Sequence, residues 1–146
     1  MKIIIDTDEK YTDTEVTIKA RALTPSVEKL ISLMRMTDMQ LAVRKGDETV
    51  LLDLGNVLYI EAVDRSTFIY TDSDVYESEL KLYEIENQLS NLDFIRISKQ
   101  TIVNLKKVTS LKADLNRKIR ITLSNGEQTI VSRMYSDEFR KRLGIK

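Results

Sequence analysis

Short segments of strand-forming residues follow one another from Leu41 onward, separated by turn residues at intervals of about eight to twelve residues. Lys45-Gly46-Asp47 is the first of these turns. Ser124-Asn125-Gly126 is the last, and its Asn-Gly pair tolerates the positive φ of a tight hairpin. The strands do not alternate regularly with helices, as a parallel sheet requires. The pattern therefore predicts antiparallel sheets and gives no support to a nucleotide-binding Rossmann fold.

The same pattern predicts where the strands and later helices lie. The expected strands are Gln40–Arg44, Glu48–Asp53, Asn56–Ala62, Thr67–Thr71, Phe94–Ile97, Thr101–Leu105, Val108–Leu115, Lys118–Leu123 and Gln128–Ser132. A helix is expected over Glu79–Leu89, where apolar side chains recur on one face. A last helix is expected to begin with Ser136 as its N-cap and to end at Gly144.

Residues 1–40 form a separate N-terminal unit in this scheme. Lys2–Asp6 and Glu15–Arg21 are predicted strands, and Thr24-Pro25 predicts the start of a helix. Four apolar side chains share one face of that helix: Val27, Leu30, Ile31 and Met34. Three methionines fit either core packing or a partner surface: Met34, Met36 and Met39. The expected fold is α+β, mainly β, with a strand-helix extension over 1–40 and a β-rich domain over 41–146.

The chain contains neither cysteine nor histidine. This excludes disulfides, zinc sites built from these ligands, and nucleophiles activated by histidine. The four glycines do not form a phosphate-binding loop of the glycine-rich kinds. No signal-peptide pattern opens the chain, since Lys2–Ile5 runs directly into Asp6. We therefore expect a cytoplasmic protein without cofactor or metal.

Charge is distributed unevenly along the chain. Residues 1–95 carry 10 Lys/Arg and 19 Asp/Glu, a net charge of −9, whereas residues 96–146 carry 13 Lys/Arg and 4 Asp/Glu, a net charge of +9. A basic region of this kind favours contact with a polyanion such as nucleic acid. An acidic half that folds against a basic half explains the same distribution, so charge alone leaves both interpretations open.

Four segments carry a resemblance to a known family. They are Leu58-Tyr59-Ile60-Glu61-Ala62, Tyr83–Leu89, Phe94–Asn104, and Val131-Ser132-Arg133 followed by Tyr135. Residues 41–145, which contain them, resemble the LytTR family of bacterial DNA-binding domains. The resemblance implies antiparallel sheets whose loops enter successive major grooves on one side of duplex DNA. Most proteins that bind the major groove insert a helix instead.

The resemblance also implies three places of DNA contact: the loop over residues 64–67, a position in the Phe94–Asn104 segment, and the closing motif. The candidate contacts are Arg65, Ser66, Thr67, Lys99 and Arg133. Arg forms two hydrogen bonds to one guanine, and Lys either does likewise or neutralises a phosphate. The chain departs from the family where histidine is usual, at Ser98 and in the first loop, so Lys99 and Arg133 are the firmer assignments.

Other basic residues of the C-terminal half are expected to attract the DNA backbone. They are Lys106, Lys107, Lys112, Arg117, Lys118 and Arg120. Lys106 and Lys118 are the two candidates for phosphate contact. Asn104 is expected to be structural, because its amide can satisfy backbone groups at a strand end.

The sequence therefore predicts sequence-specific binding of double-stranded DNA and regulation of transcription, without catalysis. The resemblance further implies a homodimer on paired promoter repeats and a regulatory membrane-protein partner. An alternative is a protein-interaction module whose basic half binds an acidic partner or a membrane surface. A third possibility, a carboxylate-dependent hydrolase, rests on Asp72-Ser73-Asp74 and Asp6-Thr7-Asp8, which fit turn residues and a strand end better.

Overall fold

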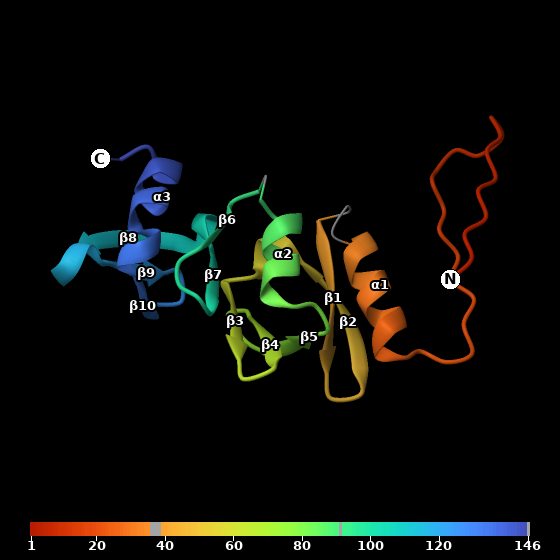
Figure 1. Ribbon diagram of the computed structural model, residues 1–146, viewed down its shortest axis with the longest axis horizontal. Coiled ribbons are helices and arrows are strands. Elements are labelled where there is room, and N and C mark those ends of the chain that lie inside the picture. The colour runs from red at the N-terminus through yellow and green to blue at the C-terminus, as the bar shows by residue number, and fades with distance from the viewer. Residues whose placement is uncertain (36–38, 91, 146) are drawn as a thin grey trace.

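The computed structural model describes residues 1–35, 39–90 and 92–145. Figure 1 shows a larger sheet in the middle of the molecule, a smaller sheet at one end and the N-terminal segment at the other. The larger sheet has seven strands in the order β2-β1-β5-β4-β3-β7-β6, and the smaller has three in the order β10-β9-β8. All neighbouring strands are antiparallel, which confirms the predicted fold class.

The helices and strands lie close to their predicted positions from residue 40 onward. In chain order they are α1 (Pro25–Arg35), β1 (Gln40–Lys45), β2 (Glu48–Asp53), η2 (Leu54–Asn56), β3 (Tyr59–Val63), β4 (Ser66–Tyr70), β5 (Val75–Ser78), α2 (Leu82–Gln88), β6 (Phe94–Arg96), β7 (Thr101–Asn104), η3 (Leu105–Lys107), β8 (Val108–Ala113), η4 (Leu115–Arg117), β9 (Ile119–Leu123), β10 (Gln128–Val131) and α3 (Arg133–Leu143). The Asn-Gly turn between β9 and β10 forms as predicted, with Gly126 at a φ of 90°.

Two hydrophobic cores lie on opposite faces of β6 and β7. Phe94 and Ile102 belong to a core that includes the apolar face of α2. Ile95 and Val103 belong to a second core, with β9, β10 and Phe139 of α3. Successive strand residues point to opposite faces of a sheet, so two consecutive apolar residues in each strand place one side chain in each core. The β6–β7 hairpin therefore joins the larger sheet to the C-terminal layer, which consists of β8, β9, β10 and α3.

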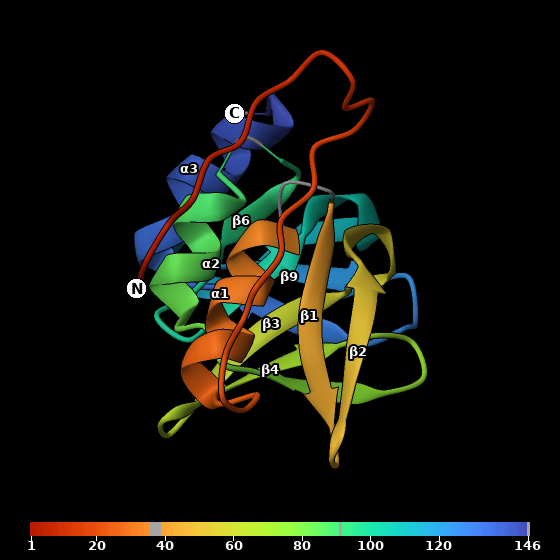
Figure 2. The same ribbon diagram turned by 90° about the vertical axis from the view of Figure 1, so that its right-hand side faces the viewer.

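The predicted strands Lys2–Asp6 and Glu15–Arg21 are not formed, because residues 1–24 contain neither helix nor strand. A strand needs a neighbour for its backbone N–H and C=O groups, and among the described residues no strand of either sheet pairs with this segment. Figures 1 and 2 show it on the outside of the end of the molecule formed by α1, β1 and β2. The residues alternate as in a strand, but the described part of the chain offers them no neighbouring strand.

Helix α1 begins at Pro25 as predicted, yet its predicted apolar face is only half buried. The one fully buried residue of the helix is Ser32, whose hydroxyl donates to the carbonyl of Ala42 at 2.7 Å. This bond gives a β1 carbonyl a partner. The carbonyl lies near Arg44, the residue at which β1 pairs with β5. The three methionines do not form one buried or one exposed set. Met34 is half buried, Met39 is exposed, and Met36 lies outside the described residues.

Candidate nucleic-acid interface

An open groove of about 590 Å³ lies where three parts of the chain meet. The β6–β7 loop, the η4 turn between β8 and β9, and the start of α3 contribute its walls. The lining residues are Ser98, Lys99, Gln100, Asn116, Lys118, Ser132, Arg133, Met134 and Tyr135. Lys99 and Arg133, which are well separated in the sequence, therefore lie on one surface.

Backbone hydrogen bonds hold the β6–β7 loop in place from two sides. The N–H of Ser132, just before α3, donates to the carbonyl of Ile97 at 2.8 Å. On the other side, the N–H of Ala62 in β3 donates to the carbonyl of Gln100 at 2.8 Å. The loop is therefore fixed to the start of α3 and to the strand that leads into the β3–β4 turn.

The β6–β7 loop is also tight within itself. The N–H of Ile97 donates to the carbonyl of Thr101 at 2.9 Å, and the hydroxyl of Ser98 accepts from the N–H of Gln100 at 3.2 Å. Ser98 thus has a structural role at the position where histidine is usual in the family it resembles. Lys99 occupies the exposed tip of this loop.

Helix α3 begins earlier than predicted. Ser132 has the extended backbone of an N-cap residue, and the helix runs from Arg133 to Leu143. Ser136 is buried inside the helix, where its hydroxyl donates to the carbonyl of Arg133 at 3.0 Å. The prediction of Ser136 as the cap is therefore wrong. The earlier start places Arg133 in the first helical turn, beside the groove.

The groove is lined by basic residues and by no acidic ones. Within residues 1–35, 39–90 and 92–145, no acidic side chain forms a salt bridge with Lys99, Lys118 or Arg133. Three other candidate cations are paired: Lys106 with Asp93 at 3.4 Å, Arg117 with Asp137 at 2.9 Å, and Arg120 with Asp114 at 3.1 Å. The unpaired charges make the groove a local region of positive potential.

The first predicted loop is a tight turn outside this groove. Val63 pairs with Ser66, so only Asp64 and Arg65 connect β3 to β4, with Asp64 at a φ of 56°. Arg65 is exposed and Ser66 is half buried. Thr67 is only 3% exposed, between β3 and β5 in the sheet, and this burial removes it from the set of available contacts.

Lys106 and Asn104 lie at the opposite end of β7 from Lys99. The amide of Asn104 donates to the carbonyl of Val57 at 2.9 Å, and its oxygen accepts from the N–H of Lys106 at 3.1 Å. The expected structural role of Asn104 is confirmed. The two candidates for phosphate contact are therefore separated, with Lys118 at the groove and Lys106 away from it.

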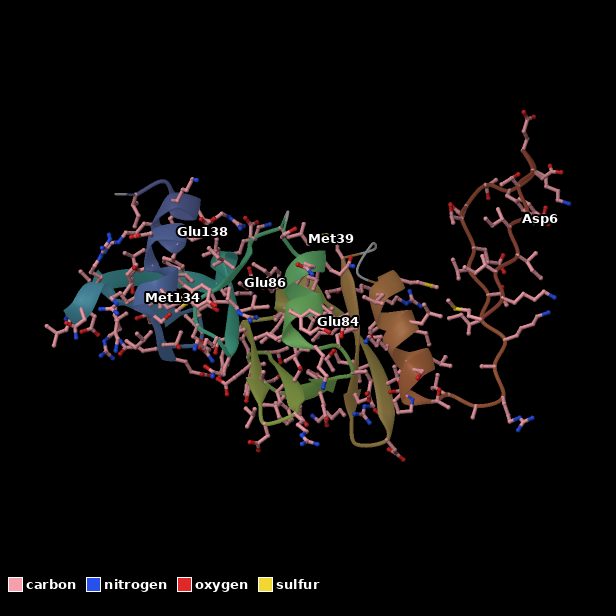
Figure 3. All side chains as sticks on the ribbon, in the orientation of Figure 1. Asp6, Met39, Glu84, Glu86, Met134 and Glu138 are labelled. Carbon is pink, nitrogen blue, oxygen red and sulfur yellow. The ribbon has the colours of Figure 1, made fainter. Side chains whose placement is uncertain are left out.

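Six residues that line the groove are not among the predicted contacts: Ser98, Gln100, Asn116, Ser132, Met134 and Tyr135. Met134 is 73% exposed. Figure 3 shows it on α3, well separated along the molecule from Glu84 and Glu86 of α2. Asn116 has a φ of 57°, a left-handed conformation that asparagine tolerates in turns.

Other kinds of site find little support in the described part of the chain. It contains no group of three His, Cys, Asp or Glu residues that could hold a metal ion. None of its helices is long and apolar enough to cross a membrane. Strands separate α1, α2 and α3 from one another, so the described residues contain no helix-turn-helix.

Comparisons with known proteins agree with the fold. A family model described as the LytTr DNA-binding domain matches residues 47–144. Two proteins of Staphylococcus aureus, strains MSSA476 and NCTC 8325, are 28% and 27% identical, with 99% of each chain covered; both are called uncharacterized HTH-type transcriptional regulators. A solved LytTr DNA-binding domain, from a putative methyl-accepting/DNA response regulator of Bacillus cereus, is similar with a TM-score of 0.70 and 27% identity. That match covers 73% of this chain and 98% of the solved one.

Proposed function

The chain belongs to the LytTR family of DNA-binding domains, and on that premise we propose that it regulates transcription by holding Lys99 and Arg133 against base edges of duplex DNA. DNA binding and transcription regulation follow from the family and from the relatives. The particular contacts are our proposal. In this scheme the protein acts by binding alone, without catalysis, and works in the cytoplasm, where bacterial DNA lies.

One observation supports these contacts above all others. Lys99, Lys118 and Arg133 line a single groove and have no salt bridge among the described residues, whereas several neighbouring cations are paired. A cation that already contacts a carboxylate must give up that contact to bind a phosphate or base. The unpaired cations are available without such a loss.

The geometry suggests a division of roles. Arg133, at the start of α3, can form two hydrogen bonds to the O6 and N7 atoms of guanine. Lys99, at the tip of the β6–β7 loop, is the second base contact, and Lys118 neutralises a phosphate. Arg65 and Ser66, on the separate β3–β4 turn, reach the next part of the duplex. We leave out Thr67, because it is buried in the sheet, and Lys106, because it lies away from the groove.

The test is selection of a binding sequence from random duplexes, followed by fluorescence anisotropy at two salt concentrations. We expect binding to weaken steeply with salt and yet to keep a preference for the selected duplex over a random one. Equal binding to any duplex and to heparin would favour the alternative of a general polyanion or acidic-partner module. A selected sequence also supplies the probe for every later experiment.

We also propose a homodimer on DNA. Two linked copies bind two adjacent sites far more tightly than one copy binds one site, because the second contact becomes intramolecular. Light scattering of the protein with a duplex that carries two selected sites tests this. A mass of one protein chain per duplex at saturation would contradict it.

A regulatory membrane protein is the last part of the proposal, and the family resemblance is its only support. Copurification with the product of an adjacent membrane-protein gene, followed by release of the selected duplex, is the matching experiment. Absence of any such gene beside this one would remove the idea.

A further inference from the structure

We propose that residues 13–21 of two copies pair as antiparallel strands centred on Thr17, and that this pairing forms the interface of the homodimer proposed above, on which the inference rests. The occupant of this surface is thus a second copy of the chain. Three observations lead to this assignment: the exposed apolar side chains of residues 1–24, and the unpaired backbone and the charge order of residues 13–21.

The N-terminal segment exposes an unusual amount of apolar surface. Residues 1–24 hold seven of the sixteen large apolar side chains that are exposed in the described part of the chain. They are Met1, Ile3, Ile4, Ile5, Tyr11, Val16 and Leu23. Exposed apolar side chains that gather in one place are typical of an interaction surface.

The backbone of this segment is ready for pairing. The chain reverses at Asp8–Tyr11, where the N–H of Lys10 donates to the carboxylate of Asp8 at 2.9 Å and the hydroxyl of Tyr11 donates to Asp6 at 2.8 Å. Beyond this turn, no backbone group of residues 12–21 forms a hydrogen bond with another backbone group in the part of the chain that the structure describes. Figure 3 shows Asp6 on this segment, apart from the two sheets. A second strand would satisfy the free backbone groups.

The charges of the segment are ordered so that it complements itself. Acidic residues occupy positions 13 and 15, and basic residues occupy positions 19 and 21. With Thr17 on the two-fold axis, Asp13 faces the partner's Arg21, and Glu15 faces the partner's Lys19. Each pair occurs twice by symmetry, so all four charged positions find an opposite charge.

The apolar residues of the segment fall on one face in the same register. Val16 lies opposite the partner's Ile18, on the face away from the charged pairs, because side chains alternate along a strand. Burying this apolar face against another apolar surface would stabilise the strand pair. Helix α1 follows directly after the segment, and its Val27 and Ile31 are only half buried. The strand pair and the two α1 helices can therefore cover one another.

Single-cysteine crosslinking tests the register, because the chain has no cysteine of its own. In this arrangement the two copies of residue 17 lie directly opposite, with Cβ atoms about 5 Å apart, whereas the two copies of residue 20 lie about 20 Å apart along the strands. Thr17→Cys should form a disulfide-linked dimer under mild oxidation, and the matched variant Ala20→Cys should not. Failure of Thr17→Cys, or equal crosslinking by both variants, would overturn the proposal.

Charge reversal provides a second measurement. Lys19→Glu places two acidic residues opposite each other at both symmetric positions, and we expect it to raise the dimer dissociation constant about tenfold in sedimentation experiments. The double variant Glu15→Lys/Lys19→Glu restores the opposite charges and should recover most of the lost affinity. No effect of the single reversal, or no recovery in the double variant, would count against this interface.

These experiments separate the interface from the proposals it rests on. A stable dimer that ignores Lys19→Glu and does not crosslink at position 17 would leave the homodimer in place and reject this interface. A monomer under all conditions, including on a two-site duplex, would reject both. Affinity of the Thr17→Cys variant for a single-site duplex should match that of the unmodified chain, because the groove lies on another part of the molecule.

Discussion

The backbone N–H of Ser132 donates a hydrogen bond to the carbonyl of Ile97 at 2.8 Å. This bond joins two segments that are far apart in the sequence: one leads into the loop of Lys99, and the other into the helix that begins with Arg133. Both side chains therefore line the same groove. Since the bond involves only backbone atoms, this arrangement depends on the fold of the C-terminal layer and not on the two cations themselves.

Arg133→Ala should reduce the preference for the selected duplex over a random duplex by about 10- to 100-fold, the range expected when one arginine–guanine contact is lost. Anisotropy competition measures this ratio. The control is Arg142→Ala, which removes the same charge at the far end of the same helix, where Arg142 donates to the carbonyl of Leu92. A uniform loss of affinity for both duplexes would show that Arg133 contacts the backbone and not a base.

Lys118→Ala should lower the slope of log affinity against log salt by about one, because one phosphate contact is lost, with little change in sequence preference. Lys106→Ala is the matched control: it also removes one lysine, but at the other end of β7. Its slope should stay unchanged. A lower slope for Lys106→Ala with no change for Lys118→Ala would show that DNA binds at the other end of β7, away from the groove.

Asn104→Ala should destabilise the fold by about 1–3 kcal/mol, because the carbonyl of Val57 and the N–H of Lys106 lose their buried partner. Urea unfolding measures the change. Gln100→Ala, at an exposed position of the β6–β7 loop, should change stability by no more than about 0.5 kcal/mol. Similar stability of both variants would contradict the structural role of Asn104.

The raised pKa of Tyr59 makes the free energy of unfolding depend on pH in alkaline solution. Burial raises the pKa of Tyr59 above its usual value of 10.0, and the hydrogen bond from its hydroxyl to Glu127, at 3.0 Å, raises it further. The folded state therefore favours the protonated phenol. The resulting stability is present below pH 10 and is lost as the pH rises further.

Tyr59→Phe tests this prediction by removing the titrating group. The free energy of unfolding should fall less steeply above pH 10 than in the unmodified chain, although Tyr70, whose pKa burial also raises, keeps part of the slope. At neutral pH the variant should lose about 0.5–1.5 kcal/mol with the hydrogen bond to Glu127. Identical pH profiles of the two proteins would show that the pKa of Tyr59 is not raised on folding.

Features that depend on neighbouring residues could be predicted from the sequence. The turn at Asn125-Gly126 is one example, because the φ of 90° at Gly126 suits glycine in any context. The apolar face of α2 is another: Leu82, Ile85 and Leu89 recur with helical spacing and are all buried. Local chemistry decides both features.

Features that depend on distant residues could not be predicted in the same way. Serine favours helix N-caps, so Ser132 and Ser136 both fit the sequence pattern. Ser132 takes the N-cap position, with its backbone N–H bonded to the carbonyl of the distant Ile97. The alternating pattern of Glu15–Arg21 is typical of a strand, but a pattern does not show whether a partner strand exists. Lys106 and Lys118 look equivalent in the sequence, and only the topology separates them.

The most direct test of the proposed DNA face is photocrosslinking from single cysteines to the selected duplex. A photoreactive maleimide is attached at Met134→Cys, beside Arg133 in the groove, or at Tyr83→Cys, which is also exposed, on α2. We predict efficient crosslinking to DNA from position 134 and none above background from position 83. Crosslinking from position 83 with none from position 134 would contradict the account.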